Sequence, residues 1–226
     1  MTTRSSSGSN PTCTRFRQPG PTLNQVTRGR LEAFSDGVFA VAITLLALNL
    51  GVEGPGHGPL LQQLGDRWPI FISYLISFFT IGIIWVNHHA LVDNIVVVTR
   101  TLLFLNLLLL LFVVAIPAAT SLMALYLVRG DTDSHVAMAL YAAVFEGMAL
   151  AFTAIFGWTL GEGRTRHPVP AEARRSAWWR FSIGALIYIF AIAVAFVSAP
   201  ATLALIGVVA LYYIVERTPA GQRLDR

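Results

Sequence analysis

The stretch that decides the fold class is residues 30–50, Arg-Leu-Glu-Ala-Phe-Ser-Asp-Gly-Val-Phe-Ala-Val-Ala-Ile-Thr-Leu-Leu-Ala-Leu-Asn-Leu. Its run 38–50 is apolar except for Thr44 and Asn49, while charged and hydroxyl side chains crowd the residues just before that run. About 20 predominantly apolar residues in a helix cross a hydrocarbon core of about 30 Å. The stretch therefore predicts a transmembrane helix, and a carboxylate as close to its start as Asp36 needs a partner.

The composition of the whole chain agrees with this membrane assignment. Of 226 residues, 55% are hydrophobic and only 12% are charged, and the mean hydropathy is +0.63. This is too apolar for a soluble domain and places the chain among polytopic membrane proteins in contact with the lipid bilayer. The basic residues surround apolar segments, so the net charge of +4 does not indicate a nucleic-acid partner. The single cysteine, Cys13, excludes an intrachain disulfide and disfavours thiol catalysis.

Six segments approach or reach membrane-spanning length. They are residues 31–50, 68–92, 100–127, 135–161, 178–198 and 201–216. Pro200 separates the last two, which we expect to form an antiparallel hairpin. The loop 51–66 is rich in glycine and proline and predicts an irregular external turn. We therefore predict an all-α fold with six transmembrane helices in one membrane domain, residues 30–216.

The distribution of arginines predicts the orientation in the membrane. If the N-terminus lies inside, only Arg67 and Arg129 of the 16 basic residues fall on the outer side. Cytoplasmic loops carry an excess of basic residues, so we predict a multi-pass protein of the cell membrane with both termini cytoplasmic. Residues 1–29 lack the apolar core of a signal peptide and predict a disordered cytoplasmic tail. Residues 217–226 predict a short cytoplasmic C-terminal tail.

On a helical wheel the first predicted helix has two different faces. One aliphatic stripe, about two turns long, consists of Val41, Leu45 and Leu48, with Thr44 beside it. Ser35 and Asp36 fall on roughly the opposite side. The stripe either packs against lipid or a neighbouring helix, or it forms apolar rings around a pore that excludes water until it widens. Periodicity alone does not choose between these two interpretations.

The end of the second predicted span offers a partner for Asp36. It reads Trp85-Val86-Asn87-His88-His89, and the two helices run in opposite directions, so the imidazoles reach the depth of Asp36. A carboxylate, a hydroxyl and imidazoles at one level favour a structural hydrogen-bond cluster between helices, with a proton relay as the alternative. Adjacent histidines point about 100° apart on a helix, unlike the i, i+4 pair of a zinc site, so no metal is expected.

These two motifs together resemble the signature of the transmembrane protein 175 family of potassium channels. The matching residues are Arg30-x-x-x-Phe34-Ser35-Asp36 at the head of the first span and Trp85-Val86-Asn87-His88-His89 at the end of the second. The resemblance covers about residues 28–216. It implies a homotetrameric cation channel whose first helix lines a central pore, with potassium as the permeant ion and no cofactor. It also implies moderate selectivity for K+ over Na+ without a Thr-Val-Gly-Tyr-Gly filter, a motif that this sequence lacks.

The resemblance also implies roles for single residues. The hydrophobic constriction falls on Val41, Leu45 and Leu48. Because Val41 is smaller than the Ile or Leu expected there, the resemblance does not decide which of these three residues forms the tightest ring. Thr44 either adds a ring of hydroxyls to the pore or bonds back to its own helix. A network behind the pore helix anchors it, and its members are Arg30, Phe34, Ser35, Asp36, Trp85, Asn87, His88 and His89.

Other classes of function receive less support from the sequence. A secondary transporter or a proton-conducting membrane protein is the alternative, because Glu146 lies near the middle of the fourth span, where an unpaired carboxylate is costly. Glu146 is expected to be protonated, paired across helices or facing a watery crevice. Asn106 in the third span is expected to form an interhelical hydrogen bond. Neither Gly-x-Ser-x-Gly nor His-Glu-x-x-His occurs, so no catalytic site is expected and the chain is not predicted to be an enzyme.

Overall fold

The computed structural model describes residues 23–48, 50–51, 54–167 and 171–215, and within them the chain forms seven α-helices. The helices are α1 (Leu23–Ala47), α2 (Leu60–Asp66), α3 (Trp68–Asp93), α4 (Arg100–Tyr126), α5 (Thr132–Thr159), α6 (Ala171–Ala195) and α7 (Ala199–Val215). An isolated antiparallel β-bridge joins Ile95 to Thr165. The prediction of an all-α fold is confirmed.

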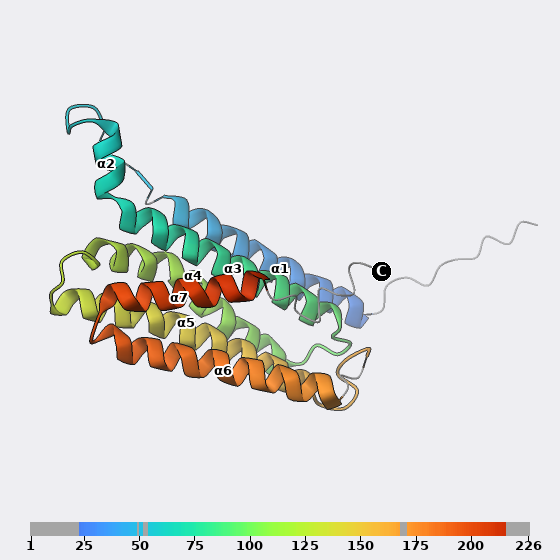
Figure 1. The fold of residues 1–226 in the computed structure, drawn as a ribbon. Helices are drawn as coiled ribbons and strands as arrows, with labels where there is room; N and C mark the ends of the chain where they lie inside the picture. The colour runs from blue at the N-terminus through green and yellow to red at the C-terminus, as the bar shows by residue number, and fades with distance from the viewer. Residues whose placement is uncertain (1–22, 49, 52–53, 168–170, 216–226) are drawn as a thin grey trace, which may run out of the picture.

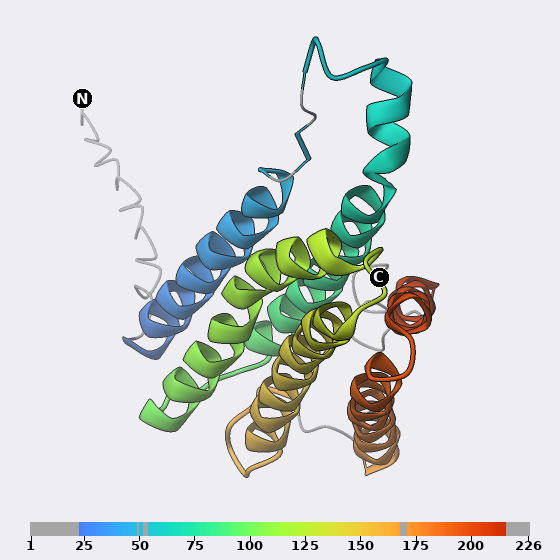
Figure 2. The same cartoon turned by 90° about the vertical axis from the view of Figure 1, so that its left-hand side faces the viewer.

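The long helices run side by side in one bundle, with α2 projecting at one end (Figures 1 and 2). The helix α4 packs against α1, α3 and α5, and α5 packs against α6 and α7 as well as α4. In Figure 1, α1 lies on one flank of the bundle and α6 on the opposite flank. The pore helix predicted from the sequence is therefore a peripheral element of the subunit, held from behind by α3 and α4.

Three helices in the described part of the chain are long and apolar enough to cross a membrane. They are α3, α4 and α5, with 26, 27 and 28 residues. The apolar parts of α6 and α7 are shorter and extend over Ile183–Ala195 and Ala199–Ile214. These helices agree with a multi-pass membrane protein, whereas the count of six spans stays a prediction.

The boundaries of α1 differ from the prediction at both ends. The helix begins at Leu23, so residues 23–29 are helical and do not belong to the predicted disordered tail. Residues 1–22 of that tail, and the predicted C-terminal tail 217–226, lie outside the described residues. At the other end α1 stops at Ala47, and Leu48 follows in a turn whose N–H donates to the Leu45 carbonyl at 3.2 Å.

The prediction of an irregular turn throughout residues 51–66 is wrong for its second half, which forms α2. Glycine and proline are concentrated before Leu60, where Gly54, Gly56 and Gly58 all have positive φ angles. The sequence Leu-Leu-Gln-Gln-Leu then allows one and a half turns of helix. Gln63 of α2 donates to the carbonyls of Gly54 and Gly58 at 3.1 and 3.0 Å, so the helix closes the glycine loop onto itself.

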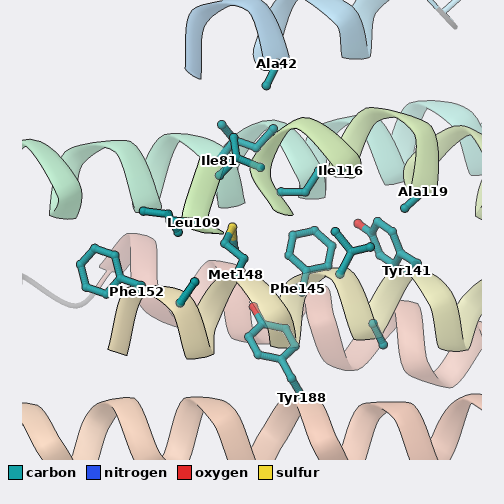
Figure 3. Close-up of a cluster of buried hydrophobic side chains, with 14 of the residues drawn as sticks. Ala42, Ile81, Leu109, Ile116, Ala119, Tyr141, Phe145, Met148, Phe152 and Tyr188 are labelled. Atoms are coloured by element: carbon teal, nitrogen blue, oxygen red, sulfur yellow. The ribbon is translucent and has the colours of Figure 1, made fainter. Parts of the chain in front are cut away.

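The apolar core contains residues of α1 and of α3 to α7, and Figure 3 shows the part of it where side chains of α1, α3, α4, α5 and α6 meet. Phe145 of α5 stacks on Tyr188 of α6, with ring centroids 5.9 Å apart and an angle of 12° between the planes. On the other side of α5, the hydroxyl of Ser77 on α3 lies 2.9 Å from that of Tyr141 and 2.8 Å from that of Thr120 on α4. A buried hydroxyl cluster thus joins three helices in a setting where water cannot replace a lost hydrogen bond.

Candidate functional site

The helix α1 divides into a buried face and an exposed face, as its helical wheel predicts. The buried residues recur every three or four positions and are Leu31, Ser35, Phe39, Ala42 and Leu46. On the other face the side chains of Val41, Leu45 and Leu48 are 55%, 37% and 76% exposed. We call these three residues the exposed stripe. No other helix of the described subunit covers the stripe, so it faces lipid or another copy of the chain.

Two details of the exposed stripe qualify the sequence prediction. Leu48 lies one residue beyond the end of α1, so only Val41 and Leu45 are held by the regular helix. Thr44 donates from Oγ1 to the carbonyl of Val41 at 2.8 Å, which is the back-bond proposed as its structural alternative. A hydroxyl that donates one bond still has two acceptor lone pairs, so the back-bond leaves room for an acceptor role.

Three polar contacts attach the first half of α1 to the last turns of α3. They are Arg28 Nη1 to Asp93 Oδ1 at 3.2 Å, Glu32 Oε1 to His89 Nδ1 at 3.1 Å, and Trp85 Nε1 donating to Asp36 Oδ1 at 2.9 Å. The contacts are spaced four residues apart on both helices, and this spacing places each set on one face. We call them the α1–α3 ladder.

A second set of contacts lies deeper and includes α4. Asn106 of α4 donates from Nδ2 to Ser35 Oγ at 3.0 Å, and its Oδ1 accepts from His88 Nε2 at 2.7 Å. Ser35 Oγ in turn donates to the Leu31 carbonyl at 2.9 Å. Ser35, His88 and Asn106 are 0%, 1% and 2% exposed. We call these three residues the buried polar chain; hydrogen bonds of this kind are strong because the surroundings do not compete for them.

The phenyl ring of Phe39 completes the contact between α1 and α3. Its centroid lies 5.5 Å from that of His88, with the two planes tilted by 53°. Phe39 is 1% exposed and sits one turn beyond Ser35 on the same face of α1. The imidazole of His88 is therefore fixed on one side by Asn106 and on another by an aromatic ring. His88 Nδ1 has no hydrogen-bond partner in the described part of the chain.

The structure brings together only some of the predicted anchoring residues. Ser35, Asp36, Trp85, His88 and His89 all make contacts between helices, as described above. The other three members make no such contacts among the described residues. Arg30 and Phe34 are exposed, and Asn87 Nδ2 donates to the carbonyl of Ile83 in its own helix at 2.9 Å.

Four residues of the site were missed or undervalued from the sequence. Arg28 and Asp93 look like charges that set topology at helix ends, and Glu32 has no evident partner in the sequence. The signal that could have found them is the repeated spacing of four residues on two antiparallel helices. Asn106 was expected to bond between helices, but nothing in the sequence shows that its partners are Ser35 and His88.

Three ladder residues also have the chemistry of metal ligands. One ligand atom each from Glu32, Asp36 and His89 lies within 4.8 Å of the others. Carboxylates and imidazole are ordinary ligands of divalent metal ions. The sequence argument against a metal considered only the adjacent histidines and missed this combination from two helices. The ladder contacts account for the positions of all three side chains without an ion.

Comparison with known proteins assigns the chain to a family. The family model described as "Endosomal/lysosomal potassium channel TMEM175" matches residues 30–117, which contain the exposed stripe and the buried polar chain. A potassium channel of Streptomyces collinus is 48% identical over 197 residues, which are 86% of this chain and 95% of that protein. This chain belongs to the TMEM175 family. The family resemblance predicted from the two motifs is confirmed.

Two further members of the TMEM175 family extend the comparison. The crystal structure of a lysosomal potassium-selective channel TMEM175 homolog from Chamaesiphon minutus matches with a TM-score of 0.74 and 31% identity, covering 84% of this chain and 98% of that one. An endosomal/lysosomal proton channel TMEM175 of Gallus gallus is 32% identical over 157 residues, 63% of this chain and 30% of that protein. The family contains proteins named for potassium and for protons, and its members are channels rather than enzymes.

Proposed function

We propose that this TMEM175 family member is a potassium-permeable cation channel whose ion path is lined by the exposed stripe of α1. The observation that carries the proposal is the contrast between the two faces of α1. One face is fixed to α3 and α4 by polar contacts, while Val41, Leu45 and Leu48 on the other have no cover within the described subunit. A helix held this firmly from behind is suited to present a constant surface to an axis shared by several copies. We propose four copies, as in the family resemblance.

The stripe supplies a mechanism that uses no carbonyl filter. Apolar rings of valine and leucine exclude water when narrow and admit hydrated ions when they widen. Potassium gives up its water more readily than sodium, so a constriction of this kind favours K+ moderately. We propose that Val41 and Leu45 form the firm part of the constriction because they lie within α1, and that Leu48 forms its more mobile mouth. Thr44 adds hydroxyl oxygens beside these rings.

The α1–α3 ladder and the buried polar chain are proposed to set the width of the pore. Both lie at the same end of α1 and on the face opposite the stripe. A shift of α3 or α4 would therefore move the stripe as a unit. The residues involved do not touch the ion, and their loss is expected to affect assembly and gating before ion preference.

We further propose six transmembrane spans per subunit, with both termini in the cytoplasm and the protein in the cell membrane. The spans would be α1, α3, α4, α5, α6 and α7. The arginine distribution supports this orientation. Trp68 is exposed at the start of α3, and Trp178 and Trp179 are exposed about two turns after the start of α6. Indole rings favour the headgroup region of the membrane.

Single-channel recording of the purified protein in planar bilayers tests this function. Unitary currents whose reversal potential follows the potassium gradient support the channel, whereas coupled flux without unitary currents supports a secondary transporter. Proton permeation is the second candidate, because the Gallus gallus relative is named a proton channel. A pH gradient applied at equal potassium concentrations separates the two ions: a shifted reversal potential indicates that protons also pass.

A further inference from the structure

Glu146 is a buried acid that neither the ladder nor the proposed ion path uses. It lies at the middle of α5, in a helix apolar enough to cross the membrane, and it is 7% exposed. Both of its carboxyl oxygens are buried without a hydrogen-bond partner among the described residues. Unsatisfied buried polar groups are rare in native proteins, so this one calls for an explanation.

The helices around Glu146 bring no positive charge to it. Residues 101–125 of α4, 181–195 of α6 and the whole of α7 contain no Asp, Glu, Lys, Arg or His. The titratable groups nearby are three phenols: Tyr188 of α6, which interacts electrostatically with Glu146, and Tyr141 and Tyr213 beside it. Figure 3 shows Tyr188 reaching from α6 toward Phe145 and Met148 on α5. Within the described part of the chain, neither a positive charge nor a hydrogen-bond donor stabilises a carboxylate at this position.

The position of Glu146 on α5 also places it beside the lipid. Ala143 and Leu150 are exposed on the outer face of α5, and they lie three residues before and four residues after Glu146. Residues with this spacing share one side of a helix. Glu146 therefore lies at the edge of the seam between α5 and α6, covered on the side of the protein and adjacent to the hydrocarbon. An ionised carboxylate is costly in both environments.

We propose that Glu146 is a proton-binding site inside the membrane, separate from the α1 ion path, and that its uncharged form is the one that lets α6 pack against α5. The ligand is a single proton, which neutralises the Glu146 carboxylate where no cationic side chain does so. Loss of the proton places a charge in the seam and opposes this packing. The proposal requires a membrane-embedded α5 but not the pore assigned to α1, so it stands or falls separately from the channel function.

A protonated acid beside lipid has a diagnostic reactivity toward lipid-soluble carbodiimides. The carboxyl proton moves to a carbodiimide nitrogen, and the carboxylate oxygen bonds to the central carbon, giving an O-acylisourea. The acyl carbon then breaks its bond to that oxygen and bonds to a nitrogen, giving a stable N-acylurea without a leaving group. The ionised acid does not supply the proton, so labelling reports the protonated form.

The first experiment treats the full-length protein in liposomes with dicyclohexylcarbodiimide over a series of pH values and maps the adduct by mass spectrometry. We expect a label on Glu146 that declines as the pH rises, and no label there in Glu146→Gln. Glu162, which is exposed just after α5, is the matched control: a water-soluble carbodiimide should modify it, and the lipid-soluble reagent should not. Absence of label on Glu146 at every pH, or a label independent of pH, would overturn the proposal.

The second experiment follows the thermal stability of wild type and Glu146→Gln against pH in the same liposomes. Glutamine has the shape of the uncharged acid and cannot ionise. We therefore expect the thermal stability of Glu146→Gln to decline less at high pH than that of the wild type. Identical pH profiles would contradict the proposal. If Glu146→Gln fails to fold, the labelling of the wild-type protein still decides.

Discussion

Asn106 connects α1 to α3 from its place on α4, and replacing it with alanine is the sharpest perturbation of the anchoring network. The change removes two hydrogen bonds, the one of 3.0 Å to Ser35 Oγ and the one of 2.7 Å from His88 Nε2. His88 would then have no hydrogen-bond partner for either ring nitrogen in the described part of the chain, because its Nδ1 already lacks one. Water cannot readily replace Asn106, because all three residues are at most 2% exposed.

The expected cost follows from the number of bonds lost. Hydrogen bonds between membrane helices contribute on average about 0.6 kcal/mol each and at most about 1.7 kcal/mol. Two bonds therefore predict a loss of about 1 to 3 kcal/mol in the free energy of unfolding for Asn106→Ala. Equilibrium unfolding in mixed micelles, with added sodium dodecyl sulfate as the denaturant, measures this change for the purified protein.

Asn87→Ala is the matched control for that experiment. In the part of the chain that the structure describes, its side-chain amide donates to a carbonyl of its own helix, at 2.9 Å, and forms no hydrogen bond to another helix. We expect Asn87→Ala to lose clearly less stability than Asn106→Ala. Equal losses in the two variants, or no loss in Asn106→Ala, would refute the reasoning that the buried polar chain fixes α1.

Three more variants test other parts of the structure. Trp85→Phe removes the donor to Asp36 and should reduce the yield of assembled channels on size-exclusion chromatography, with ion preference unchanged in those that form. Val41→Leu adds bulk to one ring of the stripe and should lower unitary conductance. Gly147→Ala should lower the free energy of unfolding by about 1 to 3 kcal/mol, because its Cβ would clash with the phenyl ring of Phe112 on α4. Gly82→Ala, which has open space, is its control and should be neutral or stabilising.

Hydropathy and helical periodicity predicted the helices and the two faces of α1 because both follow from local sequence. Leu31, Ser35, Phe39, Ala42 and Leu46 are buried where a period of 3.6 residues puts them. The helix ends were less predictable. The helix α1 starts at Leu23, eight residues before the predicted span, although Thr22-Leu23-Asn24-Gln25 has the spacing of a capping box that the prediction did not weigh. The sequence did not predict α2, because this short helix follows a glycine-rich loop and is joined to that loop by hydrogen bonds of the Gln63 side chain.

The candidate site could be predicted only in part, because its contacts join different helices and are not fixed by local sequence. The sequence placed Asp36 at the depth of the imidazoles of the second span, but its partner is the indole N–H of Trp85, at 2.9 Å. The imidazole of His89 pairs with Glu32 instead, and that of His88 with Asn106. The pairing of Arg28 with Asp93 was missed because charges at helix ends also serve to set topology. What lies opposite the exposed stripe is outside a single copy of the chain, and no periodicity within one copy contains that information.

The central claim is that the exposed stripe lines the ion path, and cysteine modification tests it most directly. Cys13 is the only cysteine in the sequence, so Cys13→Ser gives a background free of thiols. In that background, single channels of Leu45→Cys should lose most of their current when a positively charged methanethiosulfonate reagent is added. Leu186→Cys, at a residue that is 63% exposed on α6, should keep its current. Full modification of Leu45→Cys with unchanged current would contradict the account.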